Sequence, residues 1–254
     1  MNLSKAIECL EEMNLRMSDK RECSNVTAVI LAGGVGSRLR PAVSDRPKVL
    51  AEVNGRPYLE HLFDQLLGTG IDHTVICTGH LAQMVQEACG PNYRSMKLSY
   101  SQEFTPMGTG GALRLARPFI MSNTVLVMNG DSYCTANLKT FQESHDNRAA
   151  SASILLTDVP DTSRYGRVQF DDQSRVICFE EKGTHSGHGW INAGIYLIQA
   201  GKLESIPAGR AVSLEHEIFP SWVEQGLYGY CCNSRFLDIG TPESYAEAES
   251  FFTA

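Results

Sequence analysis

The chain has 254 residues, of which 43% are hydrophobic and 20% are charged, with 22 Gly and 10 Pro. This balance excludes disordered, collagen-like and coiled-coil proteins, all of which need a more biased residue usage. With 22 basic against 29 acidic side chains, the net charge of -7 argues against general binding to nucleic acid. A local cluster of cations can still bind a small phosphorylated ligand.

Neither a signal peptide nor a membrane span is expected. The first twenty residues are too charged for a signal peptide, and no apolar run approaches the ~20 residues that a membrane-spanning helix needs. The eight cysteines include no C-x-x-C pair, and several lie in apolar runs, as Cys77 does. This usage favours mostly buried thiols over a disulfide or zinc framework, and therefore a cytoplasmic protein.

Residues 1–24 are expected to form an amphipathic N-terminal helix. Apolar side chains recur there at helical spacing between charged ones, at Leu3, Ile7, Leu10, Met13 and Met17. We interpret this extension as a helix that packs on the body or on a second subunit. A regulatory or docking role is the alternative.

From residue 26 onward, short apolar runs alternate with helical stretches. Strands are expected at 26–32, 74–78, 97–102 and 124–128, and helices at 57–68, 80–89, 108–117 and 137–147. This alternation indicates βαβ crossovers and a Rossmann-like α/β fold, with a mixed, mostly parallel sheet flanked by helices. Ligands of such sheets bind at the carboxyl ends of the strands.

After residue 150 the pattern changes. Strands at 152–156, 166–170, 175–179 and 191–198 follow with few helices between them. Helical patterns return at 214–225 and 242–252, around a short strand at 227–232. No Pro/Gly/Ser-rich linker interrupts the chain, so we expect a single domain over 25–254, with halves of about 25–150 and 151–254. The second half is the more antiparallel one and shares the sheet.

The first strand runs into the glycine-rich segment LAGGVGSRLRP (31–41), which is followed by DRPK (45–48). Glycines after a buried strand let backbone N–H groups approach an anion, because no Cβ blocks the way. The dinucleotide fingerprint G-x-G-x-x-G fails at Leu39, and the Walker motif is absent. The arginines and Lys48 make this stretch locally cationic, which favours a triphosphate over a nicotinamide ligand.

Two aspartates follow apolar runs in distant parts of the chain. Asp131 comes after the run at 125–128, and Asp238 follows Leu237 and precedes a glycine turn. Either aspartate alone is explained as a turn or capping residue. Together they suit Mg²⁺, which takes oxygen ligands and binds substrate phosphates through its remaining positions.

The pattern G-G-x-G-[ST]-R-L followed by P-K resembles the signature of the sugar-1-phosphate nucleotidyltransferases, over about residues 26–252. The resemblance implies transfer of a nucleoside monophosphate from a nucleoside triphosphate to a sugar 1-phosphate, with release of pyrophosphate and with Mg²⁺ as cofactor. It also implies a nucleotide half followed by a sugar-phosphate half. A homo-oligomer stays open.

The resemblance assigns roles to particular residues. It implies that the glycines after the first strand wrap the nucleotide, that Arg38 holds the leaving pyrophosphate and that Lys48 binds phosphate near the reacting phosphorus. The nucleotide-binding set is Leu31, Ala32, Gly33, Gly34, Gly36, Ser37, Arg38, Lys48, Gly108, Thr109, Gly110, Asn129 and Gly130. The sugar-phosphate set is Tyr165, Gly166, Glu181, Lys182, Asn192 and Gly194. The metal ligands are Asp131 and Asp238, and the catalytic set is Arg38, Lys48, Asp131 and Lys182.

Within the family, the chain most resembles the guanylyltransferases that act on D-glycero-D-manno-heptose 1-phosphate. The shared motifs are PMGTGG (106–111), NGDS (129–132), RYG (164–166), FEEK (179–182), INAGIY (191–196) and FLDIGTPESY (236–245). This implies GTP as the nucleotide and GDP-heptose as the product. The chain departs from the pattern at Val49, where many relatives have a second proline, and in its N-terminal helix.

Two alternatives remain open at this point. One is a uridylyl- or thymidylyltransferase that acts on another hexose 1-phosphate. The other is a non-catalytic regulatory protein that binds a nucleotide sugar, although a pure binder has no need of both metal carboxylates.

Overall fold

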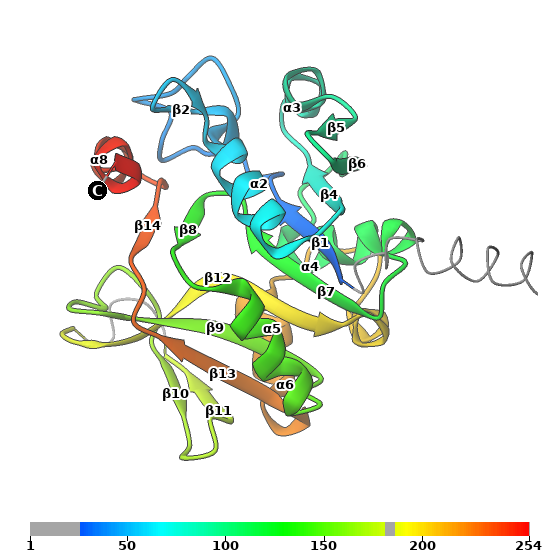
Figure 1. The fold of residues 1–254 in the computed structure, drawn as a ribbon, viewed down its shortest axis with the longest axis vertical. Coiled ribbons are helices and arrows are strands. Elements are labelled where there is room, and N and C mark those ends of the chain that lie inside the picture. The colour runs from blue at the N-terminus through cyan, green and yellow to red at the C-terminus, as the bar shows by residue number, and fades with distance from the viewer. Residues whose placement is uncertain (1–25, 181–185, 254) are drawn as a thin grey trace, which may run out of the picture.

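The computed structural model describes residues 26–180 and 186–253 (Figure 1). The predicted N-terminal helix over 1–24 lies outside these residues, as do the predicted sugar-phosphate residues Glu181 and Lys182. Within the described ranges, none of the helices combines the length and apolar character that crossing a bilayer requires.

An eight-stranded sheet in the order β13-β9-β12-β7-β1-β4-β6-β5 forms the centre of the molecule. Its first-half strands are β1 (Val26–Leu31), β4 (His73–Thr78), β5 (Asn92–Tyr93), β6 (Met96–Gln102) and β7 (Thr124–Asn129). β1 pairs in parallel with β4 and β7, and β4 pairs in parallel with β6, while β5 is an antiparallel edge strand. Because parallel strands need crossover connections, a helical segment follows most of them.

Helices cover both faces of this sheet (Figure 1). They are α2 (Tyr58–Thr69), α3 (Ala82–Cys89), α4 (Gly108–Ala116) and α5 (Leu138–Asn147). Alternate residues of β1 point to opposite faces, so Ile30 packs in the core that contains α2 and Val29 in the core that contains α4. The strands β1, β4 and β7 are therefore buried on both faces, which explains their largely apolar sequences.

The second half extends the same sheet with β9 (Ala152–Val159), β12 (Gly189–Gln199) and β13 (Leu227–Cys232). β12 pairs antiparallel with both β7 and β9, and β13 pairs in parallel with β9. The register between β12 and β9 shifts between Asn192 and Tyr196. β12 thus joins the two halves into one sheet.

Short two-stranded sheets surround the main sheet. They pair β2 (Glu52–Val53) with β3 (Arg56–Pro57), β8 (Ser132–Cys134) with β14 (Phe236–Asp238), and β10 (Val168–Phe170) with β11 (Val176–Phe179). The remaining α-helices are α6 (Phe219–Trp222), α7 (Pro242–Ala246) and α8 (Ala248–Thr253).

The predicted fold class is confirmed, with differences at the ends and breaks of elements. The helix expected at 214–225 is a π-helical turn at Leu214–Ile218, the short α6 and a 3-10 turn. The helix expected at 242–252 is broken into α7 and α8. The helix expected at 80–89 begins at Ala82, because Leu81 has a left-handed backbone with φ of 56° that no α-helix continues through.

The cysteines of the described residues are all free, but the prediction that most thiols are buried is only partly right. Cys77 and Cys134 are buried, whereas Cys178 and Cys231 are exposed. Cys178 lies in β11, a short strand of a surface hairpin, where the outward face meets solvent. Apolar neighbours in the sequence therefore do not predict whether a cysteine side chain faces the core or the solvent.

Candidate active site

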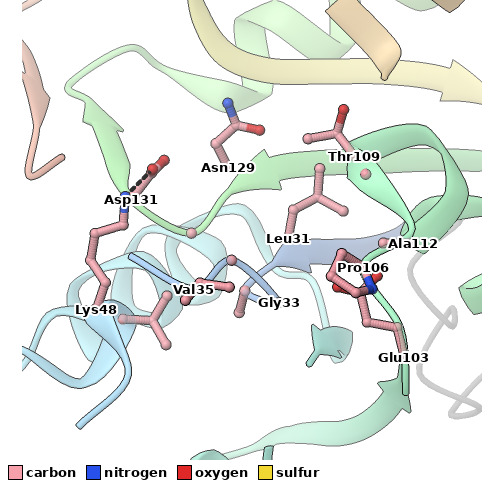
Figure 2. A pocket seen from close by; sticks show the side chains of 15 residues that line it. Leu31, Gly33, Val35, Lys48, Glu103, Pro106, Thr109, Ala112, Asn129 and Asp131 are labelled. Carbon is pink, nitrogen blue, oxygen red and sulfur yellow. Dashed lines mark hydrogen bonds and ion pairs between the residues drawn. The ribbon is translucent and has the colours of Figure 1, made fainter. Parts of the chain in front are cut away.

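A cavity of about 310 Å³ opens at the carboxyl ends of β1, β6 and β7 (Figure 2). Its walls combine the loop after β1, the start of α4 and the end of β7. The lining residues are Leu31, Ala32, Gly33, Gly34, Val35, Lys48, Val49, Glu103, Pro106, Gly108, Thr109, Ala112, Asn129, Gly130 and Asp131. We refer to it as the first cavity.

A second cavity of about 370 Å³ adjoins the first. It is lined by Arg38, Thr109, Asn129, Asp131, Ser132, Tyr165, Gly166, Arg167, Val168, Phe179, Glu180, Asn192, Gly194, Tyr196, Glu215, His216, Pro220, Phe236 and Asp238. Thr109, Asn129 and Asp131 line both cavities and form what we name the shared wall. Two ligands occupying these cavities would meet there.

The loop after β1 presents open backbone to the first cavity. A Cβ added at Gly34 would meet no atom within 4 Å, so packing does not require a glycine there. A Cβ at Gly33 would lie 2.8 Å from Glu103 Oε1. Gly36 turns the loop with φ of +63°, a conformation that L-residues rarely adopt. A Cβ at Gly34 would thus enter open space, and this residue lines the cavity where a ligand would lie.

Lys48 and Asp131 form an ion pair at the junction of the two cavities. Lys48 Nζ lies 2.5 Å from Asp131 Oδ2, with the two side chains 14% and 35% exposed (Figure 2). Pro47 precedes the 3-10 turn that carries Lys48, and Asp131 follows the end of β7. The lysine is therefore held beside the shared wall, where a phosphate group could compete for its ammonium.

The two predicted metal carboxylates lie side by side. β14 pairs with β8 so that Asp238 is opposite Ser132, and Ile239 N donates to the Asp131 carbonyl over 2.9 Å. Burial raises the pKa of Asp238, and the negative charge of Asp131 raises it further, against the lowering effect of the Gly240 N–H. Across residues 26–180 and 186–253, no group of three or more His, Cys, Asp or Glu side chains has the arrangement of a metal site.

Arg38 stands on the side of the second cavity, near Asp238. It lines that cavity, and its positive charge lowers the pKa of Asp238, although less than burial raises it. Arg38 itself is exposed. The sequence placed it in the loop after β1, and the structure shows that this loop delivers its guanidinium to the second cavity.

The predicted sugar-side residues within the described chain gather in the second cavity. Tyr165 contacts Phe236 edge to face, with ring centroids 5.5 Å apart. Asn192 accepts from Gly194 N over 2.8 Å and donates from Nδ2 to Tyr196 Oη over 3.0 Å. Gly194 has φ of +74° where β12 shifts register against β9. This bulge brings the Asn192 side chain to the cavity wall.

The turn before α4 is held by the segment near Val212. Gly110 N donates to Val212 O over 2.9 Å, and Val212 N donates to Met107 O over 2.8 Å. A Cβ at Gly108 would lie 2.5 Å from Val212 O, so a glycine is required there for packing. Gly108 and Thr109 reach the first cavity, whereas Gly110, Gly36 and Ser37 line neither of the two cavities described above.

Three carboxylates that the sequence analysis did not assign also line these cavities, namely Glu103, Glu180 and Glu215. Glu103 follows β6, so the general rule for carboxyl ends of parallel strands could have identified it. Its pKa is raised by burial, while its Oε2 accepts from Met107 N over 3.0 Å. Glu215 lies in the π-helical turn and gave no local signal, because the surrounding sequence reads as an ordinary amphipathic helix.

The chain matches the nucleotidyl transferase family model over residues 27–254. It is 34% identical over 223 residues to the D-glycero-alpha-D-manno-heptose 1-phosphate guanylyltransferase of Aneurinibacillus thermoaerophilus, covering 87% of this chain and 96% of the relative. It is 33% identical to the mannose-1-phosphate guanylyltransferase of Mycobacterium tuberculosis, covering 89% of this chain but 64% of that protein.

Solved structures agree with this grouping. HddC from Yersinia pseudotuberculosis superposes with a TM-score of 0.80 at 32% identity, covering 89% of this chain and 99% of HddC. A structure of HddC complexed with GMP-PN superposes with a TM-score of 0.79 at 31% identity, again covering 89% of this chain and 99% of HddC. The chain belongs to the nucleotidyl transferase family. Its resemblance to the sugar-1-phosphate nucleotidyltransferases is thereby confirmed.

Proposed function

We propose that this protein transfers GMP from GTP to D-glycero-α-D-manno-heptose 1-phosphate, giving GDP-heptose and pyrophosphate. The observation that carries the proposal is the shared wall of Thr109, Asn129 and Asp131, which makes two separate cavities meet. A reaction between two bound substrates gains much of its rate from such juxtaposition. The guanylyltransferase names of the relatives supply the base and the sugar.

The first cavity is proposed to hold the nucleotide. Backbone of Leu31 to Gly34 lines it, as do Gly108, Gly130 and the side chain of Lys48. These groups suit a phosphate chain, which is bound by N–H dipoles and fixed cations. We assign Gly36 and Gly110 to shaping their turns and Ser37 to the exposed face of the loop, because these residues lie outside both cavities.

Guanine is favoured by Glu103. An ionised carboxylate only accepts hydrogen bonds, and the Watson–Crick edge of guanine presents its N1–H and N2–H donors side by side. Uracil and thymine offer a single N3–H between two acceptor oxygens, which a carboxylate repels. Since Glu103 Oε2 already accepts from Met107 N, the carboxylate is held in place at the cavity wall.

The second cavity is proposed to hold the sugar phosphate. Tyr165, Gly166, Asn192 and Gly194 line it together with Arg38. We further assign Lys182 to the sugar phosphate and Glu181 to a sugar hydroxyl, both beyond the described residues. Mannose 1-phosphate is the second candidate acceptor, because one similar relative is named for it.

Asp131 and Asp238 are proposed to hold Mg²⁺. The pair fits a hard divalent cation, because two neighbouring carboxylates supply oxygen ligands and the like charge of Asp131 helps to raise the pKa of Asp238, an effect that a bound cation would oppose. When bound, the ion would neutralise charge on phosphate oxygens. Water and substrate would complete its coordination, since these two residues supply only part of it.

The side chains of the protein then have two tasks: they hold the two substrates together and they neutralise negative charge on the phosphate oxygens. The attacking phosphate oxygen is already an anion, so no side chain has to remove a proton from it. Lys48 supplies positive charge beside the shared wall, and Arg38 does so from the second cavity. Such fixed charges stabilise the transition state because they need no reorganisation during the reaction.

The single-domain organisation over 25–254 and a cytoplasmic location are also part of the proposal. β12 supports the first, because it hydrogen-bonds to strands of both halves. The need for a supply of nucleoside triphosphates supports the second. Whether the protein forms a homo-oligomer is answered by light scattering in the same preparations.

The activity is tested by measuring pyrophosphate release with Mg²⁺ from ATP, CTP, GTP, UTP and dTTP, each paired with a panel of sugar 1-phosphates. We expect release chiefly from GTP with heptose 1-phosphate. A preference for UTP or dTTP would replace the guanine assignment. Binding of a nucleotide sugar without release from any pair would identify a non-catalytic binding protein instead.

A further inference from the structure

One carboxylate is bonded both to a residue of the shared wall and to a buried residue that lines the second cavity only. Thr109 Oγ1 donates to Glu215 Oε2 over 2.7 Å, and Tyr196 Oη donates to Glu215 Oε1 over 3.2 Å. Thr109 stands at the start of α4 and lines both cavities, while Tyr196 lies in β12 and lines only the second. Glu215 therefore bridges the elements that carry the two cavities.

On the nucleotide side, the orientation of Thr109 is fixed. Leu214 N donates to Thr109 Oγ1 over 2.8 Å, so the hydroxyl must direct its own proton elsewhere, and Glu215 is the acceptor. Ser213 Oγ donates to the same carboxylate oxygen over 3.0 Å. The position of Thr109 in the first cavity thus depends on that of Glu215.

On the sugar side, the connection continues to the cavity wall. Tyr196 is completely buried, and its hydroxyl accepts from Asn192 Nδ2 over 3.0 Å. Asn192 in turn accepts from Gly194 N over 2.8 Å. Burial, and then the charge of Glu215, raise the pKa of Tyr196 well above its usual value, so the phenol stays a donor to Glu215 at neutral pH. Such connected hydrogen bonds reinforce one another in a buried setting.

Glu215 lies in a helical turn of an unusual type. Leu214–Ile218 is a π-helical turn, a rare conformation that is frequent at functional sites. With three donors bonded to it, Glu215 has most of its acceptor positions filled by protein. This arrangement suits a residue that acts by holding others.

We propose that Glu215 is a positioning residue that couples the two substrate sites, so that nucleotide in the first cavity strengthens binding of sugar phosphate in the second. The inference rests on the proposed function. A ligand that fixes Thr109 also fixes the carboxylate, and the carboxylate fixes Tyr196 and Asn192. By thermodynamic reciprocity, the sugar phosphate strengthens nucleotide binding by the same factor.

The test measures the dissociation constant of heptose 1-phosphate by calorimetry, without and with a saturating non-hydrolysable GTP analogue. For the unaltered protein we expect a ratio within the range of about 5- to 150-fold that is typical of coupled sites. Glu215→Gln keeps the shape but directs an amide donor at one of the donors now bonded to the carboxylate. We expect the ratio to fall to near one in this variant, with KM rising for both substrates.

Other variants separate coupling from general damage. Tyr196→Phe removes the sugar-side bond and should lower the ratio while leaving affinity for the nucleotide alone unchanged. Thr109→Ser keeps the hydroxyl and should keep the ratio. Glu217→Gln, on the same turn but bonded to Arg210 over 2.9 Å, is the matched control and should also keep it.

A wild-type ratio of one overturns the inference, and so does an unchanged ratio in folded Glu215→Gln. Equal weakening of both ligands with an unchanged ratio shows a merely structural role and likewise overturns it. If Glu215→Gln does not fold, the inference is decided by the ratios of dissociation constants in Tyr196→Phe and Thr109→Ser. A lower ratio in Tyr196→Phe than in Thr109→Ser supports it, and equal ratios overturn it. Failure of the proposed function is distinct, because the wild-type protein would then release no pyrophosphate from GTP with any sugar 1-phosphate.

Discussion

The two cavities are lined by different parts of the polypeptide. The first is lined largely by short runs of consecutive residues that contain glycine, such as 31–35 and 129–131. The second is lined mostly by polar and aromatic side chains from many separate segments, among them Tyr165, Asn192 and Phe236. Backbone N–H groups at the ends of parallel strands suit phosphates, whereas sugar hydroxyls must be matched one by one with side chains. We therefore expect the backbone of the first cavity to bind the phosphates of any nucleotide, with Glu103 selecting the base, and the second cavity to select the sugar through several side chains.

The largest effect is expected for a substitution in the shared wall, because its residues line both cavities. We expect Asp131→Asn to lower kcat by about 10²- to 10³-fold, the usual loss when one preorganised electrostatic contact is removed. Steady-state pyrophosphate release measures the effect. Asp172→Asn, an exposed aspartate outside both cavities, is the control. Unchanged kcat in folded Asp131→Asn would remove this residue from the site.

Two glycine substitutions sharpen the contrast between open backbone and packed side chains. Gly34→Ala should leave the melting temperature unchanged, because its Cβ would meet nothing within 4 Å, and should raise the nucleotide KM by roughly tenfold, or about 1.4 kcal/mol. Gly194→Ala should cost stability, since φ is +74° and its Cβ would lie 2.7 Å from Ser132 Oγ.

That cost is expected to be about 1–3 kcal/mol, the usual range for strained backbone. In a chain of this length each kcal/mol lowers the melting temperature by about 2–4 °C. Calorimetric melts and KM values for both substrates separate the two variants. Destabilisation of Gly34→Ala would show that this loop is packed after all.

A smaller effect tests whether the second cavity recognises the sugar through single side chains. Tyr165→Phe should raise the KM of the sugar 1-phosphate about two- to tenfold, the value of one lost hydrogen bond, and leave the nucleotide KM unchanged. Initial-rate kinetics with each substrate varied in turn measure this. Tyr228→Phe, which lies outside both cavities, is the control. Equal changes in both KM values would argue against separate substrate cavities.

The smallest expected effect concerns pH. Burial raises the pKa of Glu103, so its carboxyl takes up a proton at a higher pH than an exposed glutamate does. The protonated form no longer accepts from both guanine donors, so the KM of GTP should rise as the pH falls through that pKa. In Glu103→Gln this dependence should be absent. The KM of GTP is measured against pH for the unaltered protein and for Glu103→Gln, and the ratio of the two KM values cancels the titration of the substrates. A ratio that does not change with pH would contradict the role of Glu103.

The parallel half could be predicted well because its signals are local. Buried apolar runs identify the strands β1, β4 and β7, an alternating pattern identifies β6, and the glycines after β1 identify the loop beside them. The position of Asp131 at a strand end follows from the same reasoning. Each of these conclusions needs only a few consecutive residues.

The second cavity depends on pairings between distant segments, which one sequence does not display. Nothing near Asp238 indicates that it pairs across from Ser132, and nothing near Glu215 indicates contact with Thr109. Helical periodicity also hides the π-helical turn that carries Glu215. For Gly110, the motif predicts a nucleotide contact, and it gives no sign that the N–H of this residue donates to Val212 O from a distant segment.

β12 has a consequence for engineering. Among the described strands of the main sheet, it alone connects the first-half strands to β9 and β13. Its register is interrupted on the edge that pairs with β9 and continuous on the edge that pairs with β7. Consider a chimera that joins residues 151–254 of a relative to residues 25–150 of this chain. Its β12 must pair correctly with strands on both of its hydrogen-bonding edges. Swapping side chains on the face of β12 that lines the second cavity is the safer route to new sugar nucleotides, because it leaves both edges intact.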